Sequence, residues 1–381
     1  MPDDRSKRLG EIKRFNKKMY KALAKERKRR ISPAEYAVRM RDPDNVLEID
    51  NLHTWFYTDI GAVRAVDGAS IAIKRGKTVG IVGESGCGKS VMSLSILRLL
   101  QEPQGQIVKG AIRFNPGENR RAVDLVKLPQ QKMDDIRGVD ITMIFQEPMT
   151  TLNPVFSIGK QLGEVLACHN AQRLSTKAIA ARCVETLKLV GIADAEGVYR
   201  MYPHELSGGM RQRVVIAMAL MCSPRLIIAD EPTTALDVTI QAQILDLLRA
   251  LKDRVSASIM LITHDLGVVA ETADYVVVMY AGRIVEQGGV QEIFHNPRHP
   301  YTIGLMRSRP SNETGGRLYS IPGNVPNPIE LPDCCFFRSR CGKSVKACGG
   351  AYPPVISLSD THKAACWLCA FEREQAIMGE P

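Results

Sequence analysis

The sequence predicts an α/β fold in which helices wrap a largely parallel sheet, followed by a loop-rich, cysteine-rich C-terminal extension. Short apolar runs alternate with stretches of helical periodicity over most of the chain, a pattern typical of parallel sheets. From Asn296 onward, prolines, glycines and cysteines replace that alternation. We therefore expect a main domain with an appendage that lacks a large core of its own.

The expected strands are short apolar segments that end at glycine or polar turns. A helix is expected from about Lys89, because apolar residues recur there at helical spacing. These elements predict three parts: a basic arm over 1–45, a main domain over 46–295 and an extension over 296–381. The expected strands are 46–49, 62–66, 70–73, 78–82, 140–145, 225–229, 259–263 and 275–280.

Positive charge is concentrated at one end of the chain. The 381 residues carry a formal charge of +10, of which residues 1–46 contribute +8. Overall charge is therefore no argument for nucleic-acid binding. No run approaches the length of about 18 apolar residues that a membrane span needs, and no signal peptide is visible, so a cytosolic protein is expected. The segment 11–30 reads as a basic helix, either solvated or in contact with acidic lipids or a partner subunit.

A glycine-rich loop follows the strand expected at 78–82. Its sequence, GESGCGKS, fits G-x-x-x-x-G-K-[ST] at every fixed position and lies between a strand and a helix. Glycines let backbone N–H groups turn toward phosphate oxygens, Lys89 reaches the β- and γ-phosphates, and the Ser90 hydroxyl ligates Mg²⁺. The loop thus predicts binding of a nucleoside triphosphate. The expected nucleotide-binding residues here are Gly83, Ser85, Gly86, Cys87, Gly88, Lys89, Ser90 and Val91.

Two further features narrow the class. The apolar strand expected near 225–229 ends in Asp230 and Glu231. Asp230 is placed to hold Mg²⁺ through water, and Glu231 to polarise an attacking water as general base. Upstream, Ser207, Gly208 and Gly209 precede a helical run, which exposes N–H groups and a hydroxyl to an anion.

In this order along the chain, the glycine-rich loop, LSGGMRQR, the apolar strand with Asp-Glu and the histidine of LITHD resemble the ABC ATPase family. The resemblance covers about 46–292, and LSGG is its most specific element because other P-loop classes lack it. It implies a RecA-like mixed sheet core, an antiparallel β subdomain and a helical subdomain at about 147–213. It also implies hydrolysis of ATP with Mg²⁺, coupled to transmembrane transport.

The resemblance implies roles for single residues. Gln146 looks like the Q-loop glutamine, which touches Mg²⁺ and senses the membrane subunits. The Ser-Gly-Gly turn looks like the signature that clamps ATP bound to a partner cassette, and Ala-Leu-Asp ending at Asp237 resembles the D-loop at the dimer seam. Phe56 or Tyr57 is expected to stack on adenine, with Phe56 favoured. His264 looks like the switch histidine, so the expected catalytic residues are Glu231, His264, Gln146 and Lys89.

Three stretches resemble the dipeptide and oligopeptide importers within this family. They are FQEPMTTLNP around Gln146, HPYT from His299 and IPGNVP from Ile321. This branch implies two transmembrane permeases, an extracytoplasmic solute-binding protein and a second cassette, either a paralogue or a copy, at the cytoplasmic face of the membrane. Two alternatives stay open: an importer of another solute such as nickel, and a non-transport ABC ATPase that binds nucleic acid.

Six of the ten cysteines crowd into the extension. In a cytosolic chain such a cluster indicates a metal or iron–sulfur site before it indicates disulfides. In the importer branch, cysteines of this region can hold a [4Fe–4S] cluster, and the matching pattern is Cys335-x5-Cys341-x6-Cys348-x17-Cys366. Zinc stays open as the second alternative, because four thiolates also suit it and Cys366-x2-Cys369 could form a knuckle. A cluster of cysteines without metal is the third.

Overall fold

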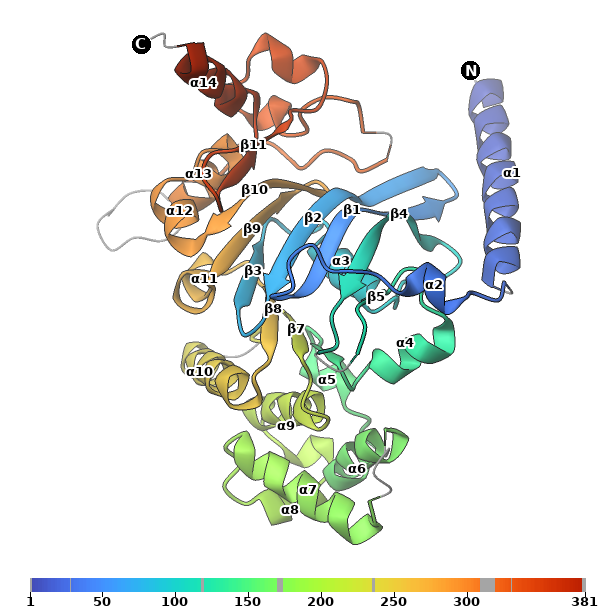
Figure 1. Cartoon of the computed structure of the whole chain (residues 1–381), viewed down its shortest axis with the longest axis vertical. Coiled ribbons are helices and arrows are strands. Elements are labelled where there is room, and N and C mark those ends of the chain that lie inside the picture. Colours follow the sequence, from blue (N-terminus) through green and yellow to red (C-terminus); the bar gives the residue numbers. More distant parts are fainter. Residues whose placement is uncertain are drawn as a thin grey trace.

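The computed structural model describes residues 2–27, 29–117, 120–169, 174–234, 237–308, 319–329 and 331–378. An eight-stranded sheet and a four-stranded sheet form the centre of the molecule. A helical subdomain lies at one end, and the C-terminal extension lies at the other (Figure 1). This arrangement confirms the predicted fold class.

The larger sheet is mixed. Its parallel pairs join β6 to β7, β7 to β8, β8 to β3 and β3 to β9, whereas the strands beyond β9 are antiparallel. Every residue of β3, β7 and β8 is buried, as near-continuous apolar strands are when both faces of a sheet are covered. In spatial order the strands are β6 (Ile141–Ile144), β7 (Leu226–Asp230), β8 (Ser258–Ile262), β3 (Thr78–Val82), β9 (Tyr275–Tyr280), β10 (Arg283–Gly289), β12 (Lys363–Ala365) and β11 (Val355–Ser357).

The smaller sheet is antiparallel. Its strands differ from those expected from the sequence, because one strand, β2, includes both runs expected at 62–66 and 70–73, and because β4 and β5 were not predicted. Gly68 separates those runs with φ +88, and the pairing with β1 shifts register nearby, so a single bent strand resembles two short ones in sequence. The strands are β2 (Gly61–Lys74), β1 (Asn45–Thr58), β4 (Gly105–Phe114) and β5 (Val123–Asp124).

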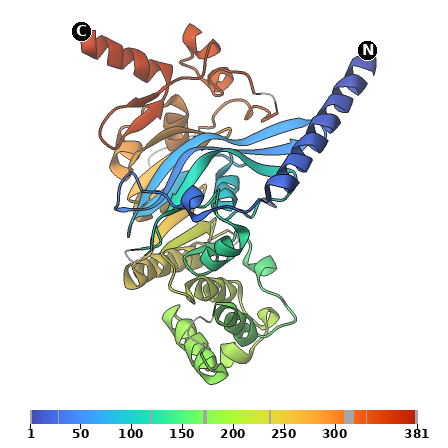
Figure 2. The ribbon, with the colours of Figure 1, turned by 45° about the vertical axis from the view of Figure 1, so that its right-hand side comes forward.

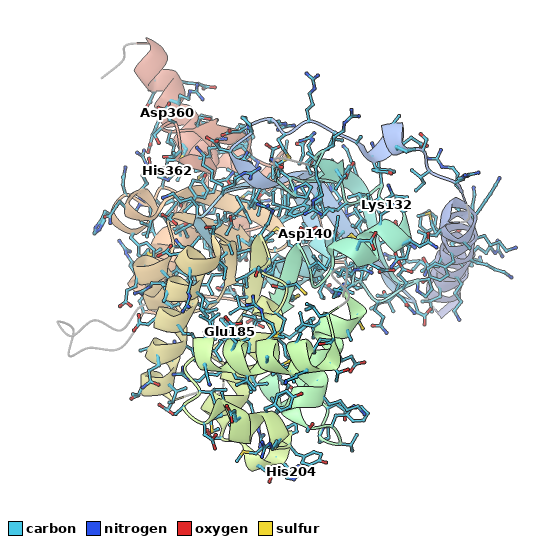
Figure 3. All side chains as sticks on the ribbon, turned by 60° about the horizontal axis from the view of Figure 1, so that its bottom comes forward. Lys132, Asp140, Glu185, His204, Asp360 and His362 are labelled. Atoms are coloured by element: carbon cyan, nitrogen blue, oxygen red, sulfur yellow. The ribbon has the colours of Figure 1, made fainter. Side chains whose placement is uncertain are left out.

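The helical subdomain is inserted between β6 and β7. Ser157 and Ser175 begin two of its helices by accepting hydrogen bonds from backbone N–H groups three residues later. Glu185 and His204 mark this subdomain in Figure 3, below His362 in the view, with His204 at the lower end. Its helices are α5 (Pro148–Thr151), α6 (Ile158–Cys168), α7 (Thr176–Leu189), α8 (Ala195–Arg200), η1 (Pro203–Glu205) and α9 (Gly208–Leu220).

The basic arm contains α1, which contacts the turn between β1 and β2. Asn16 Nδ2 donates to Thr58 O over 3.1 Å, and the Tyr20 hydroxyl donates to Tyr57 O over 3.1 Å. Figure 2 shows α1 as a separate rod beside the smaller sheet. The remaining helices outside the extension are α1 (Pro2–Arg27), α2 (Pro33–Tyr36), α3 (Lys89–Ile96), α4 (Gln130–Ile136), α10 (Val238–Val255), α11 (Leu266–Thr272) and α12 (Val290–His295).

The extension packs on the main domain through a shared core. Leu331, Phe336 and Phe337 are buried in the same cluster as Val82 and Tyr280. Strands β11 and β12 add to the edge of the larger sheet beside β10. The helices of the extension are α13 (Pro300–Arg307), η2 (Arg338–Arg340), η3 (Lys346–Gly349) and α14 (Trp367–Met378).

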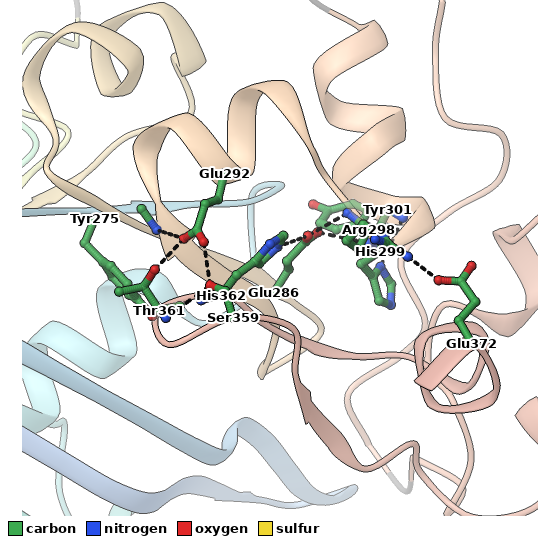
Figure 4. Close-up of polar contacts among 11 residues, drawn as sticks. Tyr275, Glu286, Glu292, Arg298, His299, Tyr301, Ser359, Thr361, His362 and Glu372 are labelled. Atoms are coloured by element: carbon green, nitrogen blue, oxygen red, sulfur yellow. Dashed lines mark hydrogen bonds and ion pairs between the residues drawn. The ribbon is translucent and has the colours of Figure 1, made fainter. Parts of the chain in front are cut away.

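Two buried or half-buried carboxylates hold the extension at that edge. Glu286 Oε1 lies 2.8 Å from His362 Nε2, and Glu292 accepts hydrogen bonds from the hydroxyls of Ser359 (2.5 Å) and Thr361 (2.7 Å). Figure 4 shows these contacts between α12, β10 and the segment before β12. Among the described helices, none combines the length and apolar character that a membrane span requires.

Candidate functional site

The glycine-rich loop is wedged between two backbone segments. A Cβ on Gly83 would lie 2.3 Å from Met279 O, and a Cβ on Gly88 would lie 2.1 Å from Ala65 O. Both glycines also have positive φ, at +154° and +101°, so no other residue fits either position without moving the main chain. The loop therefore has a shape set by its neighbours, and α3 begins at Lys89 as predicted.

The middle of the loop is open on one side and buried on the other. Ser85 and Gly86 are exposed, and a Cβ on Gly86 would meet nothing within 4 Å. Cys87 is fully buried, which raises the pKa of its thiol. Val91, on the first turn of α3, is half-buried against the core.

Lys89 lies inside the curve of the loop. Its side chain is buried, and Nζ donates to Gly83 O over 2.7 Å and to Glu84 O over 3.1 Å. These two carbonyls bring the ammonium group to the start of α3, where the helix N-terminus adds positive potential. The arrangement suits an anion held against the loop.

Asp230 and Ser90 meet at the carboxyl end of β7. Asp230 is 5% exposed, and its Oδ1 has no hydrogen-bond partner. Burial raises the pKa of the Asp230 carboxyl and the charge of Glu231 adds to the rise, whereas the hydrogen bond with Ser90 opposes it. A hydroxyl beside a buried carboxylate oxygen that lacks a partner is a donor set suited to Mg²⁺.

Glu231 lies at the centre of a polar cluster. Gln146 Nε2 donates to Glu231 Oε2 over 2.9 Å, and His264 Nδ1 lies 3.3 Å from Oε1. The three residues follow β6, β7 and β8, whose carboxyl ends meet at one edge of the sheet. The Thr234 hydroxyl also donates to Glu231 Oε2 over 3.1 Å, and its backbone N–H donates to Glu231 O across a turn. The sequence analysis did not predict this contact, although a threonine three residues after Glu231 is close enough to reach it across such a turn.

The Ser-Gly-Gly turn begins α9. Ser207 accepts a hydrogen bond from Met210 N at 3.4 Å and stays exposed, as does Gly208. A Cβ on Gly209 would lie 3.0 Å from Ile240 Cγ2 on α10, so this glycine permits close packing of the two helices.

The predicted D-loop can be followed only at its last residue. Asp237 begins α10 by accepting a hydrogen bond from Ile240 N at 3.0 Å. The preceding two predicted residues, 235–236, lie outside the described residues.

The two aromatic candidates for adenine have different surroundings. Tyr57 is 5% exposed, burial raises the pKa of its hydroxyl, and its ring lies 5.9 Å from that of Phe15 on α1. Phe56 is half-buried, and a Cβ on Gly105 would lie 2.8 Å from its ring. Of the two, Phe56 is the more accessible to a ligand.

Four cysteines of the extension share one neighbourhood. Burial raises the pKa of the Cys335 thiol to about 12, and charges on Cys348, Cys366 and Cys341 add to the rise. Cys335 N also donates to Cys348 O over 3.1 Å. A hydrogen bond with Cys369 lowers the pKa of Cys366 to about 7.

The side chains of this neighbourhood do not form a site for a single metal ion. In the described part of the chain, no three His, Cys, Asp or Glu side chains are grouped to hold one. The cysteines are free thiols. The structure thus brings together the four residues of the predicted pattern, while the presence of a metal or cluster there stays a prediction.

Comparison with known proteins gives the family. A putative peptide import ATP-binding protein of Brucella ovis is 51% identical over 328 residues, which cover 84% of this chain and 96% of that protein. The chain belongs to the ABC transporter family. Residues 66–234 of this cassette match that family, and residues 285–348 match the C-terminal region of oligopeptide/dipeptide transporters. The dipeptide transport ATP-binding protein DppD of Bacillus subtilis is 48% identical over 336 residues, 88% of this chain and 98% of that protein.

Solved structures support the same fold. A dimeric bacterial ABC transporter cassette, MJ0796, is 25% identical, with a TM-score of 0.56 over 64% of this chain and 98% of its own. The cassette cbiO1 from Clostridium perfringens, part of an ABC transporter complex, is 28% identical, with a TM-score of 0.55 over 69% of this chain and 95% of its own. The predicted family and the predicted ATPase class are thus confirmed.

Proposed function

We propose that this ABC ATPase powers the import of dipeptides and oligopeptides. The observation that carries the proposal is the match of residues 285–348 to the C-terminal region of oligopeptide/dipeptide transporters. Relatives named for peptide, dipeptide and oligopeptide transport support it. The match lies outside the nucleotide-binding segment that all ABC cassettes share, so it points to one branch of the family.

Uptake in cells tests this proposal. A strain that lacks the chain should lose uptake of labelled di- and oligopeptides, and the natural chain should restore it where Glu231→Gln does not. Uptake of labelled nickel in the same strains is the matched comparison. Unchanged peptide uptake together with lost nickel uptake would overturn the peptide assignment in favour of nickel.

At the nucleotide, we propose that Lys89 and the glycine-rich loop bind the phosphates of ATP. Ser90, Asp230 and Gln146 would hold Mg²⁺, which when bound neutralises charge on the phosphates. The Oδ1 atom of Asp230, buried without a partner, supports this assignment. Phe56 would stack on the adenine from β1.

Glu231 is proposed as the general base. It would accept the proton of the attacking water, because it lies next to Asp230 at the carboxyl end of β7. Gln146 and His264 hold its two oxygens in the structure, at 2.9 and 3.3 Å, which supports a shared role for the three side chains.

We propose that two cassettes act as a dimer, as the dimeric cassette MJ0796 does. Ser207, Gly208 and Gly209 would then bind the nucleotide of the partner, with Asp237 at the seam. The exposure of Ser207 and Gly208 at the start of a 13-residue helix supports the proposal, because the positive helix end is open to an anion from outside. The second cassette is a copy of this chain or a paralogue.

The remaining proposed partners are two membrane permeases and an extracytoplasmic solute-binding protein, with the cassette at the cytoplasmic face of the membrane. The segment after Gln146 would meet the permeases. Val155 in this segment is 70% exposed, and Phe145, directly before Gln146, is 40% exposed. Val155→Asp should release the cassette from membranes while ATP binding stays intact, and unchanged membrane association would contradict this docking surface.

In the extension, we propose that Cys335, Cys341, Cys348 and Cys366 hold a [4Fe–4S] cluster. Their mutual charge effects support a common site. Four thiolates are the number that such a cluster needs, and they also suit zinc. Protein purified without oxygen should be brown and contain iron and sulfide. Folded, colourless protein that contains zinc would favour the second alternative.

A further inference from the structure

An arginine near the middle of the extension contacts a side chain of the glycine-rich loop. Arg340, at the end of η2, donates from Nη1 to Glu84 Oε2 over 2.8 Å and from Nη2 to Glu84 Oε1 over 3.0 Å. Glu84 is the second residue of the loop and lies 256 positions earlier in the chain. The paired contacts match the two planar groups, which is the geometry that makes arginine–carboxylate pairs strong and directional.

The guanidinium group has little freedom to move. The Arg340 side chain is 5% exposed, and it also donates from Nε to Pro322 O over 2.9 Å. The central carbon of the guanidinium group, Cζ, lies 5.7 Å from the centre of the Tyr280 ring and 5.8 Å from that of the Phe337 ring. Main domain and extension thus both contribute to the pocket that orients this one side chain.

Glu84 is held on its other sides by the loop itself and by α13. Its backbone N–H donates to the Tyr301 hydroxyl over 2.9 Å, and Tyr301 is fully buried. Its carbonyl accepts the hydrogen bond from Lys89 Nζ at 3.1 Å. A continuous set of contacts therefore leads from Arg340 through Glu84 to the ammonium group that faces the phosphate site.

We propose that Arg340 is a positioning residue for ATP binding. By fixing the Glu84 side chain, it fixes the first turn of the loop and the carbonyl that orients Lys89. The extension therefore contributes to the free energy of ATP binding, although none of its residues needs to touch ATP. The inference depends on ATP binding by this family and is independent of the transported solute.

The test compares variants of the full-length chain. Arg340→Gln should weaken binding of the fluorescent nucleotide TNP-ATP about tenfold, the loss expected for a charge-assisted pair, with a similar rise in KM for ATP. Turnover at saturating ATP should fall much less. Arg340→Lys, which keeps the charge but not the paired geometry, should lie between the two. The matched control is Arg338→Gln, an exposed arginine of the same turn, which should bind like the natural chain.

A second variant approaches the pair from the loop. Glu84→Gln should weaken nucleotide binding as Arg340→Gln does, and the double variant should be no worse than either single one, because both remove the same contact. A merely structural role for Arg340 would lower the folded, active fraction and hence kcat, with KM unchanged. That result, or additive effects of the two changes, would overturn the proposal. If Arg340→Gln does not fold, Glu84→Gln and Arg340→Lys still decide it.

Discussion

The glycine-rich loop and the C-terminal extension are neighbours that are held in place in different ways. The loop takes its shape from backbone packing, with Gly83 and Gly88 pressed against carbonyl oxygens of β9 and β2. The extension is attached through side chains: Glu286, fully buried on β10, accepts from Arg298 N (2.6 Å), from His299 N (3.0 Å) and from His362 (2.8 Å) (Figure 4). Substitutions among the catalytic side chains at the phosphate site should therefore change mainly chemistry, whereas substitutions at Glu286, which anchors the extension, should change mainly stability.

The largest expected effect is on chemistry. Glu231→Gln should reduce ATP turnover by at least about 100-fold, because the amide cannot accept the proton of the attacking water. Stability should change little, since Gln146 and Thr234 can still bond the amide oxygen. Phosphate release and urea unfolding measure the two quantities. Glu185→Gln, an exposed change in the helical subdomain, is the control and should leave both unchanged. Turnover within tenfold of the natural chain would remove Glu231 from the role of base.

At Glu286, which anchors the extension to β10, we expect a large loss of stability and a small loss of turnover. Glu286→Ala should lower the free energy of unfolding by about 3 kcal/mol, because it leaves two backbone N–H groups and His362 without their buried acceptor. Turnover per folded molecule should fall far less than in Glu231→Gln. The control is Glu372→Ala, which removes the exposed partner of Arg298 and should cost within about 0.5 kcal/mol. Equal destabilisation by both changes would show that burial of Glu286 carries no special weight.

The same contrast explains what could be predicted from sequence. Strand 78–82, strand 275–280 and the helix start at Lys89 were predicted correctly. The spacing of apolar residues and the composition of the glycine-rich loop can be read from neighbouring residues alone. The carboxylates after an apolar strand identified Glu231, and the family resemblance identified Gln146 and His264; the structure brings the three together. The contact of Arg340 with Glu84 could not be predicted, because it depends on how two distant regions pack. The only signal was an arginine directly before a clustered cysteine.

An intermediate effect is expected from pH. Burial lowers the pKa of His299 from 6.5 to about 4, with Glu286 opposing the change. The neutral ring is also required locally, because Nδ1 accepts a hydrogen bond from Tyr301 N at the start of α13, where a positive charge is unfavourable. Below pH 6.5 the unfolded chain binds a proton that the folded chain does not, so stability falls as the pH drops from 6.5 toward 4.

His299→Asn separates this contribution from the rest. Asparagine can still cap the helix but has no proton to gain. The natural chain should lose about 2 kcal/mol more than the variant between pH 7 and pH 5, as measured by urea unfolding at each pH. The difference between the two chains should vanish if the ring is already protonated in the folded state at pH 6. That result would mean that the extension is not anchored around a neutral His299.

The smallest expected effect concerns α1, whose side chains Asn16 and Tyr20 donate hydrogen bonds to backbone carbonyls of β1. Asn16→Ala removes one hydrogen bond to Thr58 O and should cost about 1 kcal/mol or less. Hydrogen exchange in α1 should rise while ATP turnover and KM stay unchanged, because this contact lies beyond Phe56 on the strand and reaches only a backbone carbonyl. Lys17→Ala, an exposed neighbour, is the control and should change neither. A raised KM in Asn16→Ala alone would place α1 with the extension, as a second peripheral element that positions the nucleotide site.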